Sequence, residues 1–232
     1  MISMCFDFGH GGSDSGASYK GRFEKNDTLK LGMAVAKEVR RHGVKVDETR
    51  TNDRTMSLSE RSNFERKGNY DYFISFHRNA FKPEAAEGVE TFTYTRQTAK
   101  AKSLATRIQK NLVGVGFKDR GVKKANFHVL RETRSPAVLI EVGFIDNSKD
   151  NRIFDSKFSE IVEAITRAIL DEVGIKYKPI GGSSSKPSAP SNSKETYYRV
   201  MAGSFKDRKN AEAQIEKLKK VGFDATIMIF NK

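Results

Sequence analysis

The chain has 232 residues, of which 37% are hydrophobic, and it carries a single cysteine and a formal net charge of +13. This length accommodates one large domain and a small second one. The single cysteine excludes an internal disulfide, and no apolar run approaches the ~20 residues of a membrane-spanning helix. The positive charge predicts a polyanionic partner.

The first 177 residues alternate predicted strands and helices. In chain order we expect a strand at 2–8, a helix at 27–42, a strand at 44–49, a helix at 57–66, strands at 70–76 and 89–94, a helix at 98–113, strands at 127–130 and 137–142, and a helix at 156–173. Asn26 or Asp27 is expected to cap the first of these helices, and Gly43 is expected to end it. Such alternation is typical of an α/β domain with a mostly parallel sheet flanked by helices.

A glycine-rich loop follows the first predicted strand and contains His10. Glycines on both sides let the backbone turn sharply and bring the imidazole to a site without steric cost. Asp7 is placed either to orient the ring of His10 or to cap the loop, and Asp14 has the same two possible roles. A phosphate-binding loop is disfavoured because neither Gly-x-Gly-x-x-Gly nor a following Gly-Lys-Ser/Thr is present.

Two further polar residues lie at the ends of predicted strands. His77 follows the apolar segment 70–76, and Glu141 interrupts the apolar run 137–144. A carboxylate in a buried strand needs a partner or a function, and an ion pair with an arginine is the alternative to a catalytic role. Because ligands of parallel sheets bind at the carboxyl ends of the strands, we expect His10, His77 and Glu141 to lie close together.

The cysteine and the two remaining histidines have ordinary interpretations. Cys5 lies in the first strand and is expected to be a small buried core residue, although a nucleophilic pair with His10 is the alternative. His42 lies at a helix C-terminus, where a partly cationic imidazole suits the helix dipole. His128 lies close in sequence to the strand of Glu141 and is a candidate for the substrate cleft.

Four separated stretches occur together in a fixed order. They are Asp7-Phe8-Gly9-His10-Gly11-Gly12, Glu24 before the first helix, Ser75-Phe76-His77-Arg78-Asn79-Ala80, and Ala137-Val138-Leu139-Ile140-Glu141-Val142-Gly143-Phe144. Over residues 1–176 this pattern resembles the zinc-dependent N-acetylmuramoyl-L-alanine amidases of the amidase_3 type. These enzymes cut the amide between glycan and stem peptide in bacterial peptidoglycan.

The resemblance implies a role for four residues of this pattern. His10, Glu24 and His77 are expected to bind Zn²⁺, leaving a fourth position for water, and Glu141 is expected to be the general base. Two imidazoles with a carboxylate are a donor set that catalytic zinc sites use. Without the resemblance, Glu24 reads as a solvated or capping residue before a helix.

The end of the chain has a different composition. Residues 178–196 are rich in Ser, Gly and Pro and read as a linker, which separates a catalytic domain at 1–177 from a tail at 197–232. The tail pattern predicts strand, helix and strand, with Ala211, Ile215 and Leu218 on one helix face. It resembles the SPOR peptidoglycan-binding repeat at half its usual length, so wall binding and a homodimer through this βαβ unit are expected.

The charge is consistent with a cell-wall enzyme, because residues 1–177 carry +7 and the short remainder carries +6. Peptide carboxylates and teichoic phosphates make the wall polyanionic, so peptidoglycan is the expected partner. Neither nucleic acid nor a membrane is expected as a partner. A phage or prophage endolysin, or a mother-cell autolysin, is the expected enzyme. A zinc peptidase acting on other peptidoglycan bonds, and a non-catalytic protein that binds wall or DNA, are the alternatives.

The route to the wall is also an expectation from the sequence. The N-terminal residues 1–7 lack a basic region followed by an apolar region, so no signal peptide is predicted. We therefore expect synthesis in the cytoplasm and action on the wall after lysis or a holin-type membrane lesion.

Overall fold

The computed structural model describes residues 1–179, 203, 205 and 207–220. The chain divides into two compact units, Met1–Gly182 and Ser183–Lys232. Within the described residues, no helix has the length and apolar character needed to cross a membrane.

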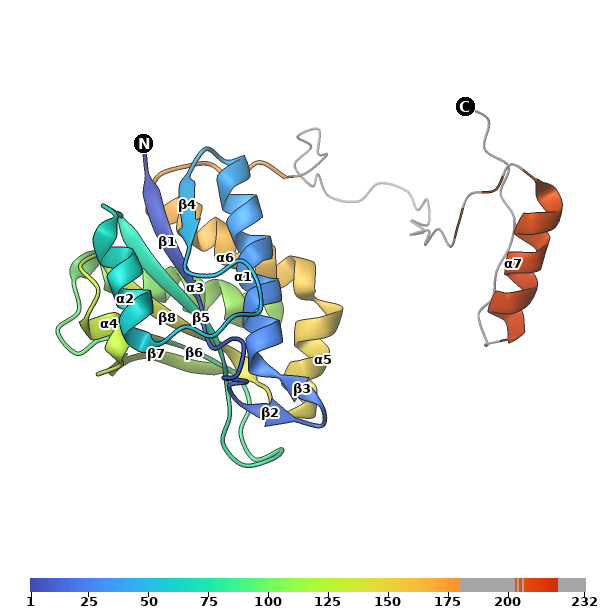
Figure 1. The fold of residues 1–232 in the computed structure, drawn as a ribbon, viewed down its shortest axis with the longest axis horizontal. Helices are drawn as coiled ribbons and strands as arrows, with labels where there is room; N and C mark the ends of the chain where they lie inside the picture. Colours follow the sequence, from blue (N-terminus) through green and yellow to red (C-terminus); the bar gives the residue numbers. More distant parts are fainter. Residues whose placement is uncertain (180–202, 204, 206, 221–232) are drawn as a thin grey trace, which may run out of the picture. The chain divides into compact units, whose positions relative to one another are not determined.

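The first unit is built on a sheet of six strands, whose layout Figure 1 shows. In spatial order the strands are β4 (Lys45–Glu48), β1 (Ser3–Phe8), β5 (Tyr72–Asn79), β8 (Ala137–Phe144), β6 (Val89–Tyr94) and β7 (Asp119–Ala125). Every neighbouring pair is parallel except β6 and β8, which are antiparallel. The expected α/β fold with a mostly parallel sheet is therefore confirmed.

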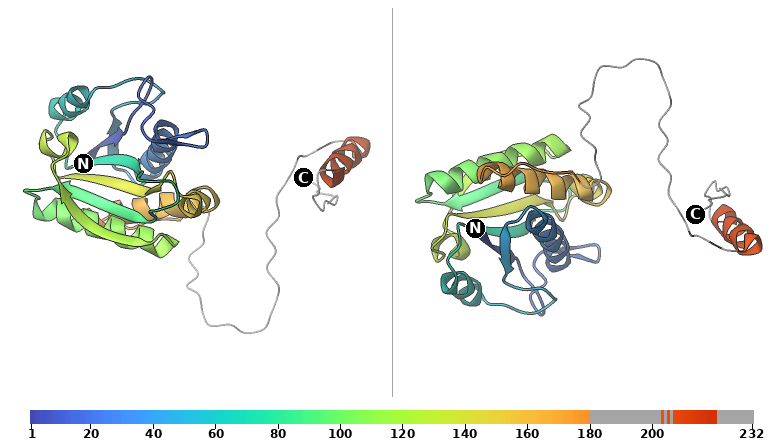
Figure 2. Two further views of the ribbon diagram at one scale, coloured as in Figure 1. Left: turned by 90° about the horizontal axis from the view of Figure 1, so that it is seen from below. Right: turned by 90° about the horizontal axis from the view of Figure 1, so that it is seen from above.

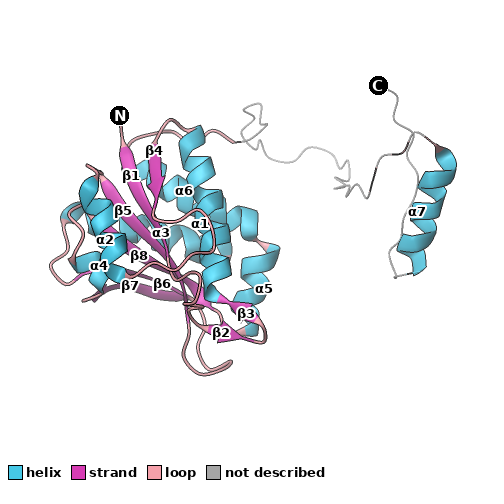
Figure 3. Cartoon of the chain, in the orientation of Figure 1, coloured by secondary structure: helices cyan, strands magenta, loops and turns pink. Residues whose placement is uncertain are grey.

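Helices cover both faces of this sheet, as Figures 2 and 3 show. The larger core packs α1 (Glu24–Arg41), α3 (Ala99–Val115) and α6 (Phe158–Glu172) against one face. The smaller core packs α2 (Leu58–Lys67) and α4 (His128–Arg131) against the other face. The helix α5 (Ser148–Ser156) follows β8, and a short hairpin of β2 (Ser18–Tyr19) and β3 (Arg22–Phe23) precedes α1.

The period-two alternation of the first strand explains its position between the two cores. Met4, Phe6 and Phe8 enter the larger core, whereas Cys5 enters the smaller one. Cys5 is fully buried, and burial raises the pKa of its thiol far above the ordinary value. The expectation of a core cysteine is thus confirmed, and a protonated, inaccessible thiol is not a nucleophile.

One predicted strand is wrong. Residues 127–130 form no strand, because His128–Arg131 makes a single helical turn, α4. In a strand, Val129 and Leu130 would point to opposite faces. The helical turn brings both of these adjacent side chains into the smaller core, where they are almost completely buried.

The start of the first helix is also different from the prediction. Helix α1 begins at Glu24, after Phe23, and no side chain caps it. Asp27 was a candidate cap, but its carboxylate instead accepts hydrogen bonds from Arg22 and Arg78. The predicted end is confirmed, since the helix ends at His42 and Gly43 adopts a left-handed conformation with φ of 81°.

The second unit contains one described helix, α7 (Arg208–Lys220). Ala211, Ile215 and Leu218 are partly buried along one stripe, while their neighbours Glu212 and Glu216 are exposed. The helix predicted in the tail is therefore present. The two strands predicted on either side of it lie outside the described residues.

Candidate metal centre and active site

Three side chains that are far apart in the sequence converge at the carboxyl ends of β1 and β5. His10 follows β1, His77 lies within β5, and Glu24 is the first residue of α1. One potential ligand atom from each residue lies within 4.8 Å of the other two. The Glu24 carboxylate is 2.9 Å from Nδ1 of His77 and 3.2 Å from Nε2 of His10.

Two glycines make this approach possible. A Cβ atom on Gly9 would lie 2.3 Å from the imidazole of His77, and one on Gly16 would lie 2.6 Å from the ring of His10. Gly16 also has φ of 62°, a conformation that side-chain-bearing residues rarely adopt. The loop after β1 therefore needs glycine so that the two imidazoles and the carboxylate can share one small volume.

Asp14, and not Asp7, contacts the imidazole of His10. The Oδ2 atom of Asp14 is 2.9 Å from Nδ1 of His10, which leaves Nε2 directed toward Glu24. The proposal that Asp7 orients His10 is therefore wrong. Asp7 is fully buried and accepts hydrogen bonds of 2.8 Å from each of Thr49, Arg61 and Ser75.

The carboxylate of Glu24 is held in its ionised form. Backbone N–H groups of Ala17 and Arg78 donate hydrogen bonds to its two oxygens, at 2.9 and 3.0 Å. Burial raises the pKa of Glu24, but hydrogen bonds and charge from His10 and His77 outweigh it, and the pKa falls well below its ordinary value. Glu24 is thus a fixed, nearly inaccessible anion between two imidazoles.

Two buried arginines support the loop that carries His10. Arg61 of α2 donates to the carbonyls of Phe8 and His10, both at 2.7 Å. Arg50 donates to the carbonyls of Phe8 and Gly9, at 2.8 and 3.0 Å. Burial, together with the nearby charge of Arg61, lowers the pKa of Arg50 to about 10, so Arg50 remains cationic at neutral pH. The sequence contained no local signal for this pair.

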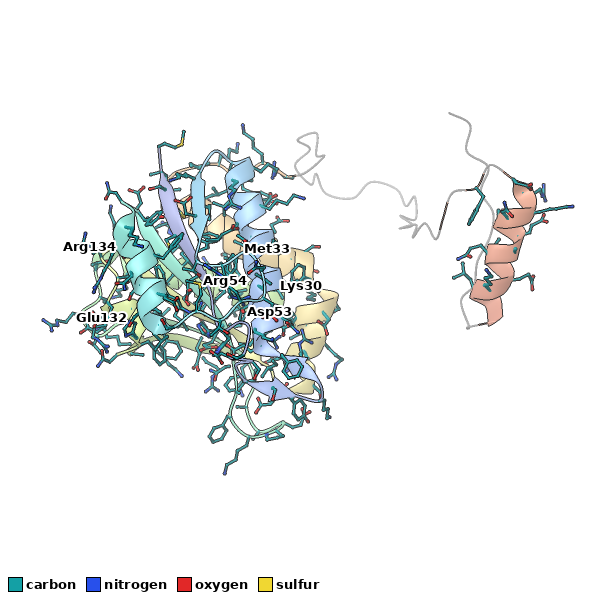
Figure 4. The ribbon with its side chains drawn as sticks, viewed as in Figure 1. Lys30, Met33, Asp53, Arg54, Glu132 and Arg134 are labelled. Atoms are coloured by element: carbon teal, nitrogen blue, oxygen red, sulfur yellow. The ribbon has the colours of Figure 1, made fainter. Side chains whose placement is uncertain are left out.

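The same loop is fixed on its exposed side by a carboxylate from the segment between β4 and α2. Asp53 accepts hydrogen bonds from the backbone N–H of Gly12 and from Nζ of Lys25, at 2.7 and 2.8 Å. Figure 4 labels Asp53 beside Arg54 in this segment, close to the start of α1. Loop and helix are therefore tied together beside the candidate metal ligands.

Glu141 lies next to the convergence point. It is in β8, where it pairs with His77 of β5 and with Glu90 of β6. Its Oε2 atom is buried and has no hydrogen-bond partner among the described residues. Burial, followed by the charges of Glu24 and Glu90, raises the pKa of Glu141 well above its ordinary value, against a smaller opposing effect of Arg78.

The donor set fits a zinc ion. Tetrahedral ligands bound to Zn²⁺ at about 2.0–2.1 Å lie roughly 3.3 Å from one another. The Glu24–His77 and Glu24–His10 separations of 2.9 and 3.2 Å are close to that spacing. The unpartnered Oε2 atom of Glu141 adds a proton acceptor beside the three candidate metal ligands. The arrangement can thus hold a metal and accept a proton next to it.

The other two histidines lie in different surroundings. His128 Nε2 is 3.2 Å from the hydroxyl of Ser62, so α4 and α2 are joined there. It does not join the group of His10, Glu24 and His77. His42 faces the carbonyl of Glu38 at 2.9 Å and stacks on Tyr177 at 5.0 Å, which confirms a structural role at the end of α1.

Comparisons of the sequence and of the structure with known proteins identify the same protein family. Residues 4–171 match the family model described as N-acetylmuramoyl-L-alanine amidase, and residues 167–229 match that of the SPOR domain. The chain is 34% identical over 231 residues to the N-acetylmuramoyl-L-alanine amidase CwlM of Bacillus licheniformis, covering 98% of this chain and 85% of that protein. It is 35% identical over 197 residues to the endolysin of Bacillus phage SPP1, covering 81% and 72%.

A solved structure extends the comparison to three dimensions. An N-acetylmuramoyl-L-alanine amidase from Clostridium difficile 630 superposes with a TM-score of 0.71 and 32% identity, over 75% of this chain and 97% of the other. The family match covers nearly the whole α/β unit, including every residue of the convergence point. The chain therefore belongs to the N-acetylmuramoyl-L-alanine amidase family.

Proposed function

We propose that this chain hydrolyses the amide bond between N-acetylmuramic acid and L-alanine in peptidoglycan, with Zn²⁺ held by His10, Glu24 and His77 and with Glu141 as the general base. The observation that carries the proposal is the convergence of two imidazoles and one ionised carboxylate beside an unpartnered buried carboxyl. Membership of the amidase family supplies the bond that is cut.

The residues divide the chemistry between them. When bound, Zn²⁺ lowers the pKa of a water molecule and polarises the carbonyl of the scissile amide. Glu24 supplies negative charge to the site, and Asp14 orients the ring of His10 through its Nδ1 atom. The glycines and buried arginines around His10 hold this geometry before substrate arrives, so that little reorganisation accompanies the reaction.

Glu141 is suited to proton transfer. Its buried Oε2 atom has no hydrogen-bond partner among the described residues, so no arginine or lysine neutralises that oxygen. A carboxyl in such low-polarity surroundings takes a proton from water more readily than an exposed one. Glu141 then donates this proton to the nitrogen of the leaving alanine, which departs as an amine.

The two alternatives are less well supported. A zinc peptidase would use the same three ligands and the same base, so the donor set alone does not separate the two reactions. The family match favours the bond between the sugar's lactyl group and alanine. A buried carboxyl oxygen without a hydrogen-bond partner, such as Oε2 of Glu141, destabilises a fold, and a non-catalytic binding protein has no use for it.

Product analysis tests the proposed reaction. Digestion of purified peptidoglycan is expected to release new N-terminal alanine and no new reducing sugar, because the amide and not the glycan is cut. A metal chelator should abolish the release, and Zn²⁺ should restore it. New N-termini on any other residue would establish the peptidase alternative, and digestion that is unaffected by chelation would exclude the metal-dependent mechanism.

We further propose that the chain consists of a catalytic domain at 1–177, a linker at 178–196 and a tail at 197–232. The tail binds peptidoglycan and pairs with the tail of a second copy of the chain. The SPOR match supports wall binding. A single helix with one apolar stripe, Ala211, Ile215 and Leu218, buries little surface alone, and a two-fold pair would cover more.

Sedimentation of the full chain and of residues 1–177 tests the pairing. The full chain is expected to sediment as a dimer at tens of micromolar, while residues 1–177 remain monomeric and still cleave soluble muramyl peptides. Intact wall should bind the shorter protein less tightly, because the residues beyond 177 carry +6 of the net charge. A full chain that stays monomeric at these concentrations would exclude the pairing.

A further inference from the structure

A pocket of about 350 Å³ is lined in part by Glu90 of β6 and Arg120 of β7. In the sheet, β8, which carries Glu141, lies between these two strands and β5, which carries His77. Residues of four strand ends and of the loop between β5 and β6 line it. Asn79 lies two residues after His77, and Phe144 lies three residues after Glu141. Glu90 is the partner of Glu141 across the β6–β8 ladder. Pocket residues therefore neighbour His77 and Glu141 along the same strands and across the β6–β8 ladder.

Two cations, Arg120 in the pocket lining and Lys123 beside it, share one carboxylate, that of Glu90. The Oε2 atom of Glu90 accepts hydrogen bonds from both Arg120, at 3.1 Å, and Lys123, while its Oε1 atom accepts from Asn79. Glu90 is almost completely buried, whereas the side chains of Arg120 and Lys123 are 31% and 41% exposed. One carboxylate is thus shared by two cations, so it does not fully neutralise Arg120, the cation that lines the pocket.

Arg120 is held in a way that leaves part of its guanidinium available. A bulge between β6 and β7 sets Arg120 and Gly121 against the single residue Glu90, and bulges of this kind redirect side chains. The guanidinium stacks on the ring of Phe144 at 4.8 Å, and its Nε atom donates to Glu90. Its two Nη groups have no hydrogen-bond partner among the described residues. An arginine fixed at Nε and open at Nη is prepared for a planar anion.

The loop that forms the rim is fixed as well. The backbone N–H of Phe81 donates to Asp146 at 3.0 Å, and the backbone N–H of Ser148 donates to Glu84 at 2.9 Å. Both carboxylates tie the loop between β5 and β6 to the start of α5. Phe81 remains 69% exposed and forms an apolar wall of the pocket. The pocket therefore exists before any ligand binds.

We infer that Arg120, assisted by Lys123, binds a carboxylate on the peptide side of the scissile amide and so makes the enzyme prefer peptides that carry it. This inference rests on the proposed function. In an N-acetylmuramoyl peptide the sugar side is uncharged, because its lactyl carboxyl is consumed in the amide. The peptide side carries carboxylates, so an arginine with open Nη groups in a pocket next to the strands of His77 and Glu141 fits that side of the substrate.

The test uses the zinc-loaded full chain and two soluble muramyl peptides that differ in one respect. In the second peptide every carboxylate is replaced by a primary amide. The unmodified enzyme is expected to show a kcat/KM about tenfold higher for the carboxylate form, in keeping with a charge-assisted hydrogen bond in a partly exposed site. Arg120→Met should retain its rate on the amide form and lose most of the preference.

Two further variants separate recognition from damage to the fold. Arg120→Lys keeps the charge but not the planar fork, and it should retain only part of the preference. Lys124→Met removes one charge at the next exposed position of β7, outside the pocket, and should keep the full preference. Because Lys123 and Asn79 still satisfy Glu90, Arg120→Met should fold normally.

Three outcomes would overturn the inference. The first is an unmodified enzyme that cuts both peptides equally well. The second is an Arg120→Met variant that slows equally on both, which would assign Arg120 a structural role. The third is an Arg120→Met variant that keeps its preference for the carboxylate peptide but binds less tightly to cell wall rich in phosphate polymers. That result would show that the pocket binds wall phosphate. An unmodified enzyme that cuts neither peptide nor wall would instead reject the proposed function itself.

Discussion

Replacement of Glu141 by glutamine is expected to reduce peptidoglycan hydrolysis by about 10²–10⁴-fold, the usual effect of removing a general base. The amide side chain has nearly the same shape, but it takes no proton from water. Glu141 lies beside His77 in the sheet, yet it is not one of the three residues whose ligand atoms converge. The variant should therefore keep about one zinc per chain in elemental analysis.

A matched control separates this effect from a general change of charge. Glu132 follows α4 and pairs with Arg66 of α2, its side chain is 34% exposed, and Figure 4 labels it near these two helices. It is not one of the residues whose ligand atoms converge. Glu132→Gln should hydrolyse wall at the unmodified rate. A Glu141→Gln variant that loses its metal would show that Glu141 is a ligand, and one that retains full activity would show that another group accepts the proton.

Replacement of Arg61 by methionine is expected to lower the free energy of unfolding by about 3–5 kcal/mol, as breaking a buried ion pair does. Arg61 and Asp7 are both almost inaccessible and are joined at 2.8 Å. Without Arg61, a buried carboxylate loses its charge partner, and the carbonyls of Phe8 and His10 lose a donor. Denaturant unfolding measures the loss, and zinc titration should show weaker binding because the His10 loop is released.

The loss of unfolding free energy in Arg61→Met is expected to depend on pH. Burial raises the pKa of Asp7, but Arg61, Ser75 and Thr49 outweigh it, so the pKa lies below its ordinary value of 3.8. The stability that the ionised Asp7 contributes is therefore present above this value and is lost as the pH falls below it. In Arg61→Met the unpaired Asp7 should titrate at a higher pH than 3.8. The difference between the two proteins is then largest near neutral pH and narrows in acid.

Arg66→Met is the control on the same helix. Arg66 pairs with Glu132 at 2.9 Å, but both side chains are exposed, at 40% and 34%. Exposed pairs of this kind contribute less than about 1 kcal/mol. If Arg61→Met costs no more than Arg66→Met, the buried pair does not stabilise the loop that carries His10.

The sequence by itself determined the fold class and most of the candidate site. The nearly continuous apolar run that includes Met4, Cys5 and Phe6 identifies a strand that is buried on both faces, because the side chains of a strand alternate between its faces. Parallel strands bring their carboxyl ends together, so the sequence alone predicts that His10 and His77 lie close together, and both contact Glu24 in the structure. These features depend on local periodicity, which a single chain displays.

Glu24 required more than periodicity. Its position before a helix has an ordinary interpretation as a cap, and only the order of four motifs singled it out. The structure shows that Phe23 occupies the capping position and that the Glu24 carboxylate instead lies between two imidazoles. The glycines at 9 and 16, whose missing Cβ atoms allow this approach, belong to the same local chain and were visible in the sequence.

Only the tertiary structure decided which polar groups meet across the sheet. Asp7 and Arg61 are 54 residues apart, so nothing in their neighbourhoods predicts that they pair, and the same pairing leaves Asp14 to orient His10. Arg120 enters the pocket through a bulge that exists only because β6 pairs with β7. Side-chain partners of this kind are set by the packing of distant segments, whereas sequence patterns report the environment of each segment and not the identity of its neighbours.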